Sequence, residues 1–331
     1  MRRSGDANIE ILTGDKRSYG NIAKKLLQSN FDVNALRTND TLLYDEWKEL
    51  DSVVLDAFQQ RLVGVADLLS RNLIYNVKRG LAASVLGFQD ASDVNAAELS
   101  MDGMNRGKRD RQKYGITYLP LPIIHKDFSF SIREIQESRN GTRPLDTSMA
   151  ELCARKVAEK AEDLLFNGSS SYTYGGGTIY GYTDFTNRNT FTIQSGGWDA
   201  ATGEQIIQDV IDMKQASIND RCFGPWILYI PTDFEGIMDT DFKANSDKTV
   251  RQRILEIGGI QDVKVSDTIT ASNVVLVQMQ SNTARIVQGL SLKTVQWDVE
   301  GGMAVNFKVM AIIVPQIRAD QTGKCGIIHG S

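Results

Sequence analysis

Hydrophobic positions recur at two different spacings along this chain. Between residues 44 and 71, apolar side chains return every three or four positions, as on one face of an amphipathic α-helix. Between Phe128 and Ile132, apolar and polar residues alternate instead, which predicts a β-strand with one buried face. Pro120 and Pro122 precede this strand and cannot donate to a sheet ladder, so the segment is predicted to be an edge strand or a projecting arm.

A second helix is predicted from Ser148 to about Phe166. Ser148 and Glu151 have the spacing of a capping box, and Gly168 follows as the C-cap residue. Small side chains recur along this helix and would permit close packing against a neighbouring element. They are Ala150, Ala154, Ala158 and Ala161.

The remaining segments mix helices and strands without a regular βαβ repeat, which indicates an α+β fold. A helix is predicted over 203–218, opened by Asp199 or Thr202, and another over 248–257, stopped by Gly258 and Gly259. Residues 169–196 are predicted to be rich in loops, with three consecutive glycines (175–177) as a flexible connection. Strands are predicted over 226–230, 263–265, 274–279, 284–287, 292–297 and 304–314, the last ending at Pro315.

A long β-hairpin arm is predicted before the alternating strand. Residues 93–102 form its rising strand, and the falling strand starts at Tyr114. The eleven residues from Gly103 to Lys113 contain five basic side chains and one acidic side chain. The basic residues of this tip are Arg106, Lys108, Arg109, Arg111 and Lys113. A solvated loop and a contact with another subunit are the two interpretations of the tip.

The composition is that of a folded protein rather than of a membrane or disordered chain. Hydrophobic residues make up 41% of the 331 residues and charged residues 24%. No apolar run approaches the length that spans a bilayer, so no membrane partner is expected. The net charge of −4 does not suggest a nucleic-acid binder. Cys153, Cys222 and Cys325 are widely spaced and are predicted to be free buried thiols.

No constellation of residues points to catalysis. The two histidines, His125 and His329, are too few for a histidine triad or a typical zinc site. The glycines at 175–177 are not followed by Lys-Ser or Lys-Thr, so they do not form a phosphate-binding loop. Acidic residues between 233 and 241 are interpreted as a solvated loop. We therefore predict no catalytic, cofactor-binding or metal site, and a chain that is not an enzyme.

Residues 113–187 resemble the E-loop and spine helix of major capsid proteins with the Hong Kong 97 fold, which tailed phages and encapsulin shells share. The resemblance is carried by the extended run "PLPIIHKDFSFSIREIQ", by the linker "RNGTRPLDTS" and by the helix end "ARKVAEKAEDLLFNG", followed by "IYGYTDFTN". It implies an α+β Hong Kong 97 fold with an N-terminal arm, an E-loop hairpin, a P-domain and an A-domain.

The resemblance also implies a division of the chain into parts. These are an N-terminal arm (1–43), a helical segment (44–92), the E-loop hairpin (93–135), the P-domain with its spine helix (136–179), the A-domain (180–303), and a return strand to the P-domain with the C-terminus (304–331).

The implied function is self-assembly of a major capsid protein into an icosahedral shell around a viral double-stranded DNA genome. The expected partners are copies of the chain itself, in pentamers and hexamers, and packaged DNA held by non-specific contacts. Scaffolding, portal and cement proteins are further candidate partners. The expected location is the virion capsid, assembled in the host cytoplasm. An encapsulin-type shell loaded with a cargo enzyme is the alternative, and a cytoplasmic α+β enzyme is a third.

Overall fold

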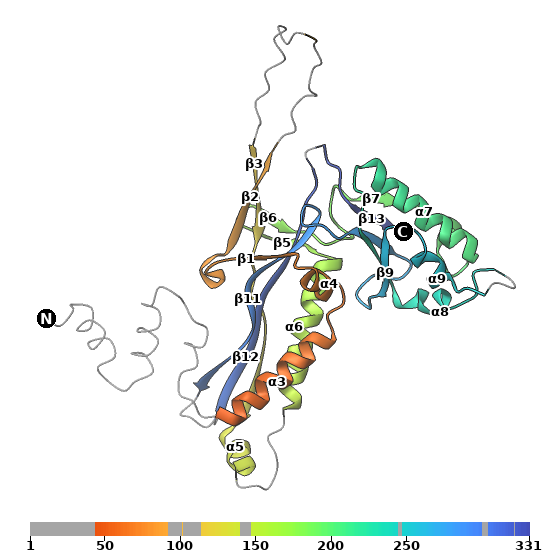
Figure 1. The fold of residues 1–331 in the computed structure, drawn as a ribbon. Helices are drawn as coiled ribbons and strands as arrows, with labels where there is room; N and C mark the ends of the chain where they lie inside the picture. Colours follow the sequence, from red (N-terminus) through yellow and green to blue (C-terminus); the bar gives the residue numbers. More distant parts are fainter. Residues whose placement is uncertain are drawn as a thin grey trace.

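The computed structural model describes residues 44–91, 101, 114–139, 147–243, 247–299, 304–320 and 322–331. Three parts are visible in Figure 1: an elongated body, an arm that projects from one end of it, and a compact unit beside that end. Helices and strands are mixed without βαβ repetition, so the α+β prediction is confirmed.

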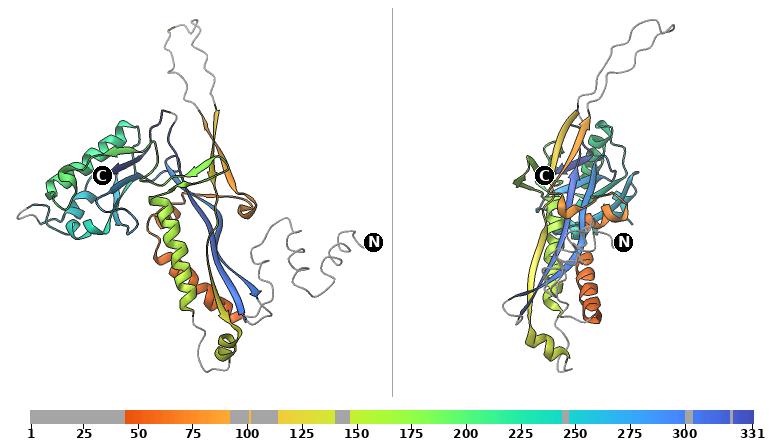
Figure 2. Two further views of the ribbon diagram at one scale, coloured as in Figure 1. Left: turned by 180° about the vertical axis from the view of Figure 1, so that it is seen from behind. Right: turned by 90° about the vertical axis from the view of Figure 1, so that its left-hand side faces the viewer.

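The elongated body is a four-stranded sheet covered by helices. The strand order is β1-β11-β12-β4. The strands are β1 (Ile74–Asn76), β11 (Ala284–Val299), β12 (Ala304–Ile317) and β4 (Ile124–Ser131). Helix α6 (Ser148–Phe166) packs on β12 and β4, and α3 (Tyr44–Gln60) packs on α6 and β11. Figures 1 and 2 show that α6 and the β11–β12 ribbon run along the length of the body.

Strand β4 shows the alternation that the sequence predicts. Phe128 and Phe130 point into the core, where their ring centroids lie 5.2 and 5.5 Å from that of Phe307 on β12. The strand pairs with β12 alone and is therefore an edge strand, as predicted from the prolines. It ends at Ser131, because Ile132 already begins the short helix α5 (Ile132–Arg139). Ser131 and Glu134 form a reciprocal capping box there.

Helix α6 lies within one residue of its predicted bounds. Its four alanines are at most 1% exposed, and Gly168 follows the C-cap residue with a φ of +67°. The predicted capping box at Ser148 and Glu151 is wrong: the N-cap is Thr147, which makes no side-chain capping bond. Thr147 already has helical φ and ψ, so Ser148 lies inside the first turn rather than before it.

The arm is a two-stranded antiparallel ribbon. Strand β2 (Val85–Ala91) pairs with β3 (Tyr114–Pro120) along its whole length. The rising strand therefore begins at Val85, earlier than the predicted 93–102, of which only Met101 lies within the described residues. The glycine triplet is not a flexible connection. Gly175 and Gly176, with φ of +61° and +79°, form the turn of a hairpin between β5 (Ser169–Tyr174) and β6 (Gly177–Ile179).

The compact unit is built on a second, mixed sheet with the order β7-β13-β10-β8-β9. Its strands are β7 (Asn189–Phe191), β13 (Ile327–Gly330), β10 (Val274–Gln278), β8 (Trp226–Ile230) and β9 (Ile260–Val265). Its helices are α7 (Gly203–Asn219), α8 (Glu235–Met238) and α9 (Val250–Leu255). The described residues also contain three 3₁₀ turns: η2 (Gly80–Ala82) after β1, and η3 (Gln194–Gly196) and η4 (Thr232–Phe234) in this unit.

Strand β8 joins the compact unit to the body, because its alternate side chains pack in two different cores. Trp226, Leu228 and Ile230 face the helices of the compact unit and belong to its own core. Ile227 and Tyr229 point to the other face and belong to the core of the elongated body. Both faces of this sheet are therefore buried, which explains the continuous apolar run WILYI.

Two predicted boundaries differ from the structure, and one strand was not predicted. Strand β12 continues past Pro315 to Ile317, because β4 pairs only as far as Ala311 and the proline has a partner on one side alone. The two segments predicted at 284–287 and 292–297 form one bulged strand, β11, in the sheet of the elongated body. The chain also returns to the compact unit as β13, which the sequence reading missed.

No helix in the described part of the chain combines the length and apolar character needed to cross a membrane.

The alanine face of α6 provides a test of packing. Ala158 is fully buried in the core of the elongated body, so Ala158→Leu should lower the free energy of unfolding by about 1–3 kcal/mol through overpacking. Thermal and urea unfolding of the subunit measure the effect. Ala200→Leu, at an exposed position, is the matched control and should leave stability unchanged. Equal stability of both variants would contradict close packing of this face.

Candidate assembly site

One face of the arm presents apolar side chains to solvent. Ile116 and Tyr118 are 57% and 44% exposed, and the missing side chain of Gly87 leaves open space beside them. Tyr172 and Tyr174 on β5 are also exposed, at 44% and 54%. Apolar side chains gathered at the root of a projecting ribbon are typical of a surface that a partner covers.

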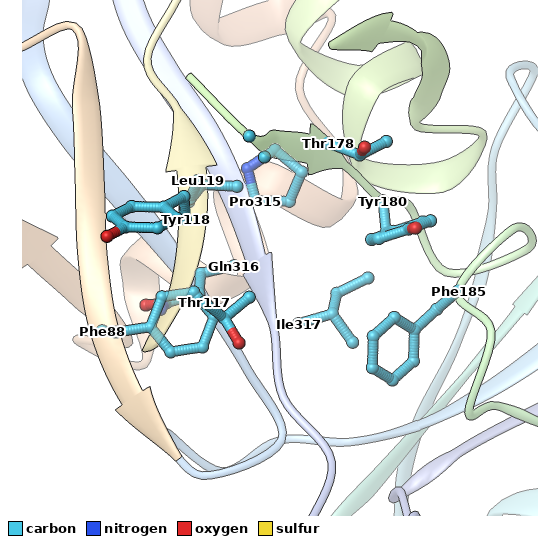
Figure 3. Close-up of a pocket in the computed structure, with 12 residues that line it drawn as sticks. Phe88, Thr117, Tyr118, Leu119, Thr178, Tyr180, Phe185, Pro315, Gln316 and Ile317 are labelled. Carbon is cyan, nitrogen blue, oxygen red and sulfur yellow. The ribbon is translucent and has the colours of Figure 1, made fainter. Parts of the chain in front are cut away.

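The β5–β6 hairpin braces the root of the arm. A Cβ on Gly177 would lie 2.1 Å from the carbonyl oxygen of Tyr118, so only glycine permits this approach. Beside the contact is a pocket of about 210 Å³ (Figure 3). Phe88 and Tyr118 line one side of the pocket, and Tyr180 and Phe185 line the other. These aromatic side chains thus surround the root of the arm and fix the direction in which the arm leaves the body.

A buried carboxylate on α6 holds the start of helix α4 (Gly64–Ser70). Glu162 is 2% exposed and accepts hydrogen bonds from the backbone N–H groups of Val63, Gly64 and Val65, at 3.2, 2.5 and 3.2 Å. These groups have no partner within the helix, so the carboxylate satisfies them. A Cβ on Gly64 would lie 2.8 Å from Leu165, which explains the glycine at this position.

This contact explains why the predicted helix over 44–71 is two helices. After α3 ends at Gln60, the chain turns so that the N–H groups of residues 63–65 point at Glu162. A continuous helix would have bonded those N–H groups to its own carbonyls. The break is therefore set by a residue that lies far away in the sequence.

One turn further along α4, Asp67 binds the compact unit. Its carboxylate accepts a hydrogen bond from the hydroxyl of Tyr229 on β8 at 2.9 Å, and it pairs with the ammonium of Lys264 on β9 at 2.5 Å. Asp67 is 6% exposed. Helix α4 is thus fixed at its start to the spine helix and at its middle to the compact unit.

The sequence carried a signal for Glu162 but none for its partners. Glu162 lies four residues after Ala158, on the buried alanine face of α6, where an unpaired charge is costly. A carboxylate on an apolar helix face therefore indicates a buried donor group. Asp67 lies among apolar residues in the same way, but its partners on β8 and β9 become neighbours only through the fold.

The predicted basic tip, Arg106 to Lys113, lies outside the described residues. The acidic segment after β8, which was predicted to be a solvated loop, forms ion pairs with Arg251 of α9. The arginine lies 2.6 Å from Glu235 and 3.5 Å from Asp239. His329 accepts a hydrogen bond from Arg188 at 3.2 Å, and burial, followed by the nearby arginine, lowers its pKa.

The cysteines and tryptophans have structural surroundings. Cys153 and Cys325 are buried free thiols, and Cys222 is a half-buried one. Trp198 and Trp226 are buried in the core of the compact unit. Within the described residues, no group of three or more histidine, cysteine or acidic side chains could hold a metal ion.

The Glu162 contact predicts a pH dependence. Burial raises the pKa of Glu162 to about 7, although its three N–H bonds act in the opposite direction. The folded chain therefore retains a proton that the unfolded chain releases near pH 4.3. This contribution to stability is present below that pH and is lost as pH rises through about 7.

The variant Glu162→Gln should lack this decline. The free energy of unfolding, measured at intervals between pH 4.5 and 8, should fall more steeply in the wild type than in the variant. Glu159→Gln removes a partly exposed carboxyl group of the same helix whose pKa is lowered, chiefly by its bond with Lys156, so it should leave the decline near pH 7 in place and serves as the control. Parallel curves for wild type and Glu162→Gln would contradict the assignment.

Comparison with known proteins matches this chain to one family model and to a curated shell protein. Residues 34–330 match DUF6260, a family of unknown function. The type 1 encapsulin shell protein EncA of Myxococcus xanthus is 23% identical over 189 residues, which cover 56% of this chain and 60% of EncA. The match thus spans less than two thirds of that relative.

Solved structures extend the likeness to the fold. A virus-like particle from Pyrococcus furiosus is 19% identical, with a TM-score of 0.62 over 86% of this chain and 99% of the other. The capsid of Myoviridae phage XM1 is 11% identical, with a TM-score of 0.61 over 81% and 92% of the two chains. The likeness to capsid structures, the spine helix beside a long β-ribbon and the projecting arm together identify the fold. The chain has the Hong Kong 97 capsid fold and belongs to the DUF6260 family.

Proposed function

We propose that this chain is a shell-forming subunit, and specifically the major capsid protein of a tailed phage or related virus. The observation that carries the proposal is the arm: a two-stranded ribbon with Ile116 and Tyr118 exposed on one face, in a chain with the Hong Kong 97 capsid fold. Covering that face in every subunit requires another copy. Burial repeated over many modest interfaces, closed by symmetry, supports a shell.

Within this proposal, the elongated body is the P-domain and the compact unit is the A-domain. The likeness to a phage capsid supports the viral interpretation, in which the shell forms in the host cytoplasm and encloses double-stranded DNA. Scaffolding, portal and cement proteins would be partners of such a shell. No catalytic role is proposed.

An encapsulin-type compartment is the second candidate. It is favoured by the sequence match to a type 1 encapsulin shell protein. The two candidates differ in content: a phage shell holds DNA that is protected from nuclease, whereas a compartment holds a cargo protein.

Electron microscopy of the purified protein, followed by analysis of the particle contents, tests both candidates. Closed particles that contain nuclease-resistant DNA would support the viral capsid. Closed particles with a stoichiometric protein cargo and no DNA would support the compartment instead. A monodisperse monomer across protein concentration and salt would overturn both.

The basic tip provides a test of the contact between subunits. We expect Arg109→Glu combined with Arg111→Glu to leave the subunit folded and to lower particle yield. Each exposed pair contributes only about 0.2–1 kcal/mol, but the loss recurs at every contact. Because exposed charges are screened by salt, the difference from wild type should shrink at high ionic strength.

The measurement is particle yield and disassembly midpoint against salt. Arg133→Glu is the control, since Arg133 lies on α5 with its side chain 87% exposed. Identical salt curves for the wild type and the double variant would show that the tip is a solvated loop.

A further inference from the structure

Two arginines lie on the same part of the elongated body without an acidic partner. Arg285 is on β11, and Arg318 follows the end of β12. The guanidinium carbon of Arg285 is 4.6 Å from the ring centroid of Tyr75, and that of Arg318 is 5.9 Å from the ring centroid of Phe88. A guanidinium that stacks on a ring keeps the donors on its edge free for an anion.

A buried amide adds a third donor. The Nε group of Arg285 donates to Oε1 of Gln316, its partner across the strands, at 2.6 Å. This bond fixes the amide orientation, because the flipped amide would place two donors against each other. The Nε2 group of Gln316 then has no hydrogen-bond partner within the described residues, although the side chain is only 1% exposed. A buried donor without an acceptor is costly.

The charges of the two arginines are also uncompensated. Both side chains are half-buried, and neither forms an ion pair with any residue that the structure describes. Burial, and then the charge of Arg318, lowers the pKa of Arg285, so the two guanidinium groups repel each other. Two uncompensated cations thus lie near each other, and one of them holds an amide whose donor has no acceptor among the described residues.

We propose that Arg285, Arg318 and the Nε2 group of Gln316 form an arginine socket that binds a carboxylate of a second copy of this chain. The inference rests on the proposed shell function, which brings copies together in a repeated arrangement. The chain has 41 acidic and 37 basic residues, so its copies carry carboxylates in excess. A single carboxylate can accept hydrogen bonds from more than one of these donors at once.

Nucleic acid fits the socket less well. A duplex presents phosphates in a continuous row, and its binding depends on several cations that neutralise several phosphates. Here, the site offers two arginines, one beside the ring of Tyr75 and the other beside the ring of Phe88. Such a site suits one anionic group on a short side chain.

The proposal predicts that loss of one arginine does not lower the stability of the free subunit but does lower the stability of the shell. In the free subunit, Arg318→Gln removes one of two mutually repelling cations, so the thermal midpoint should stay equal or rise. In the particle, the same change removes a partner of the incoming carboxylate. Subunit association should then weaken roughly tenfold, the scale of a hydrogen bond to a charged group.

The experiment compares wild type, Arg285→Gln, Arg318→Gln and the control Arg155→Gln. Arg155 already pairs with Glu151 at 2.9 Å on α6, so its removal should not show this difference between subunit and shell. Thermal midpoints of unassembled subunits, separated by size, and disassembly midpoints of particles are measured for each protein. Empty and DNA-filled particles are measured separately.

Three outcomes would overturn the socket, and a fourth would overturn the shell function on which it rests. Particles of the two socket variants that are as stable as wild type would show that no anion binds there. Equal losses in subunit and particle would show that an acid of the same chain is the partner. A loss confined to DNA-filled particles would identify phosphate as the ligand. Wild-type protein that never assembles would instead overturn the proposed shell function, on which the socket depends.

Discussion

The hydrogen bonds between Glu162 and the start of α4 hold the two large parts of the molecule in one arrangement. Glu162 belongs to the spine helix, and Asp67, one turn further along α4, binds Tyr229 and Lys264 of the compact unit. A short helix thus connects a long one to a sheet by polar contacts at its start and at its middle. Such contacts are directional, so they determine an angle between the parts that apolar burial alone would leave less defined.

Apolar packing supplies the cohesion around this polar connection. The alanine face of α6 is buried in the core, and Phe128, Phe130 and Phe307 fill the space further along the ribbon. The compact unit shares the same core through one face of β8. The described part of the arm is supported at its root, where the glycine hairpin and four aromatic side chains surround it. Ile116 and Tyr118 of the arm remain exposed within the described part of the subunit.

Local signals predicted elements well where one pattern acted alone. The capping residue Thr202, the buried strand 226–230 and the end of α6 before Gly168 all follow from neighbouring residues. Prediction failed where residues that are distant in the sequence determine the bounds of an element. Glu162 breaks the helix predicted over 44–71, and the pairing of β11 with β12 joins two predicted strands into one. Among the socket donors, Gln316 and Arg318 are two residues apart, but Arg285 becomes the neighbour of Gln316 only through the pairing of β11 with β12.

The position of β13 has a consequence for synthesis on the ribosome. This strand lies between β7 and β10 in the sheet of the compact unit, yet it follows every other strand of that sheet in the sequence. A nascent chain that already contains β7, β8, β9 and β10 still lacks the strand that lies between β7 and β10. Open sheet edges are sites of aggregation. The sheet can therefore be completed only after the last of its strands has been synthesised.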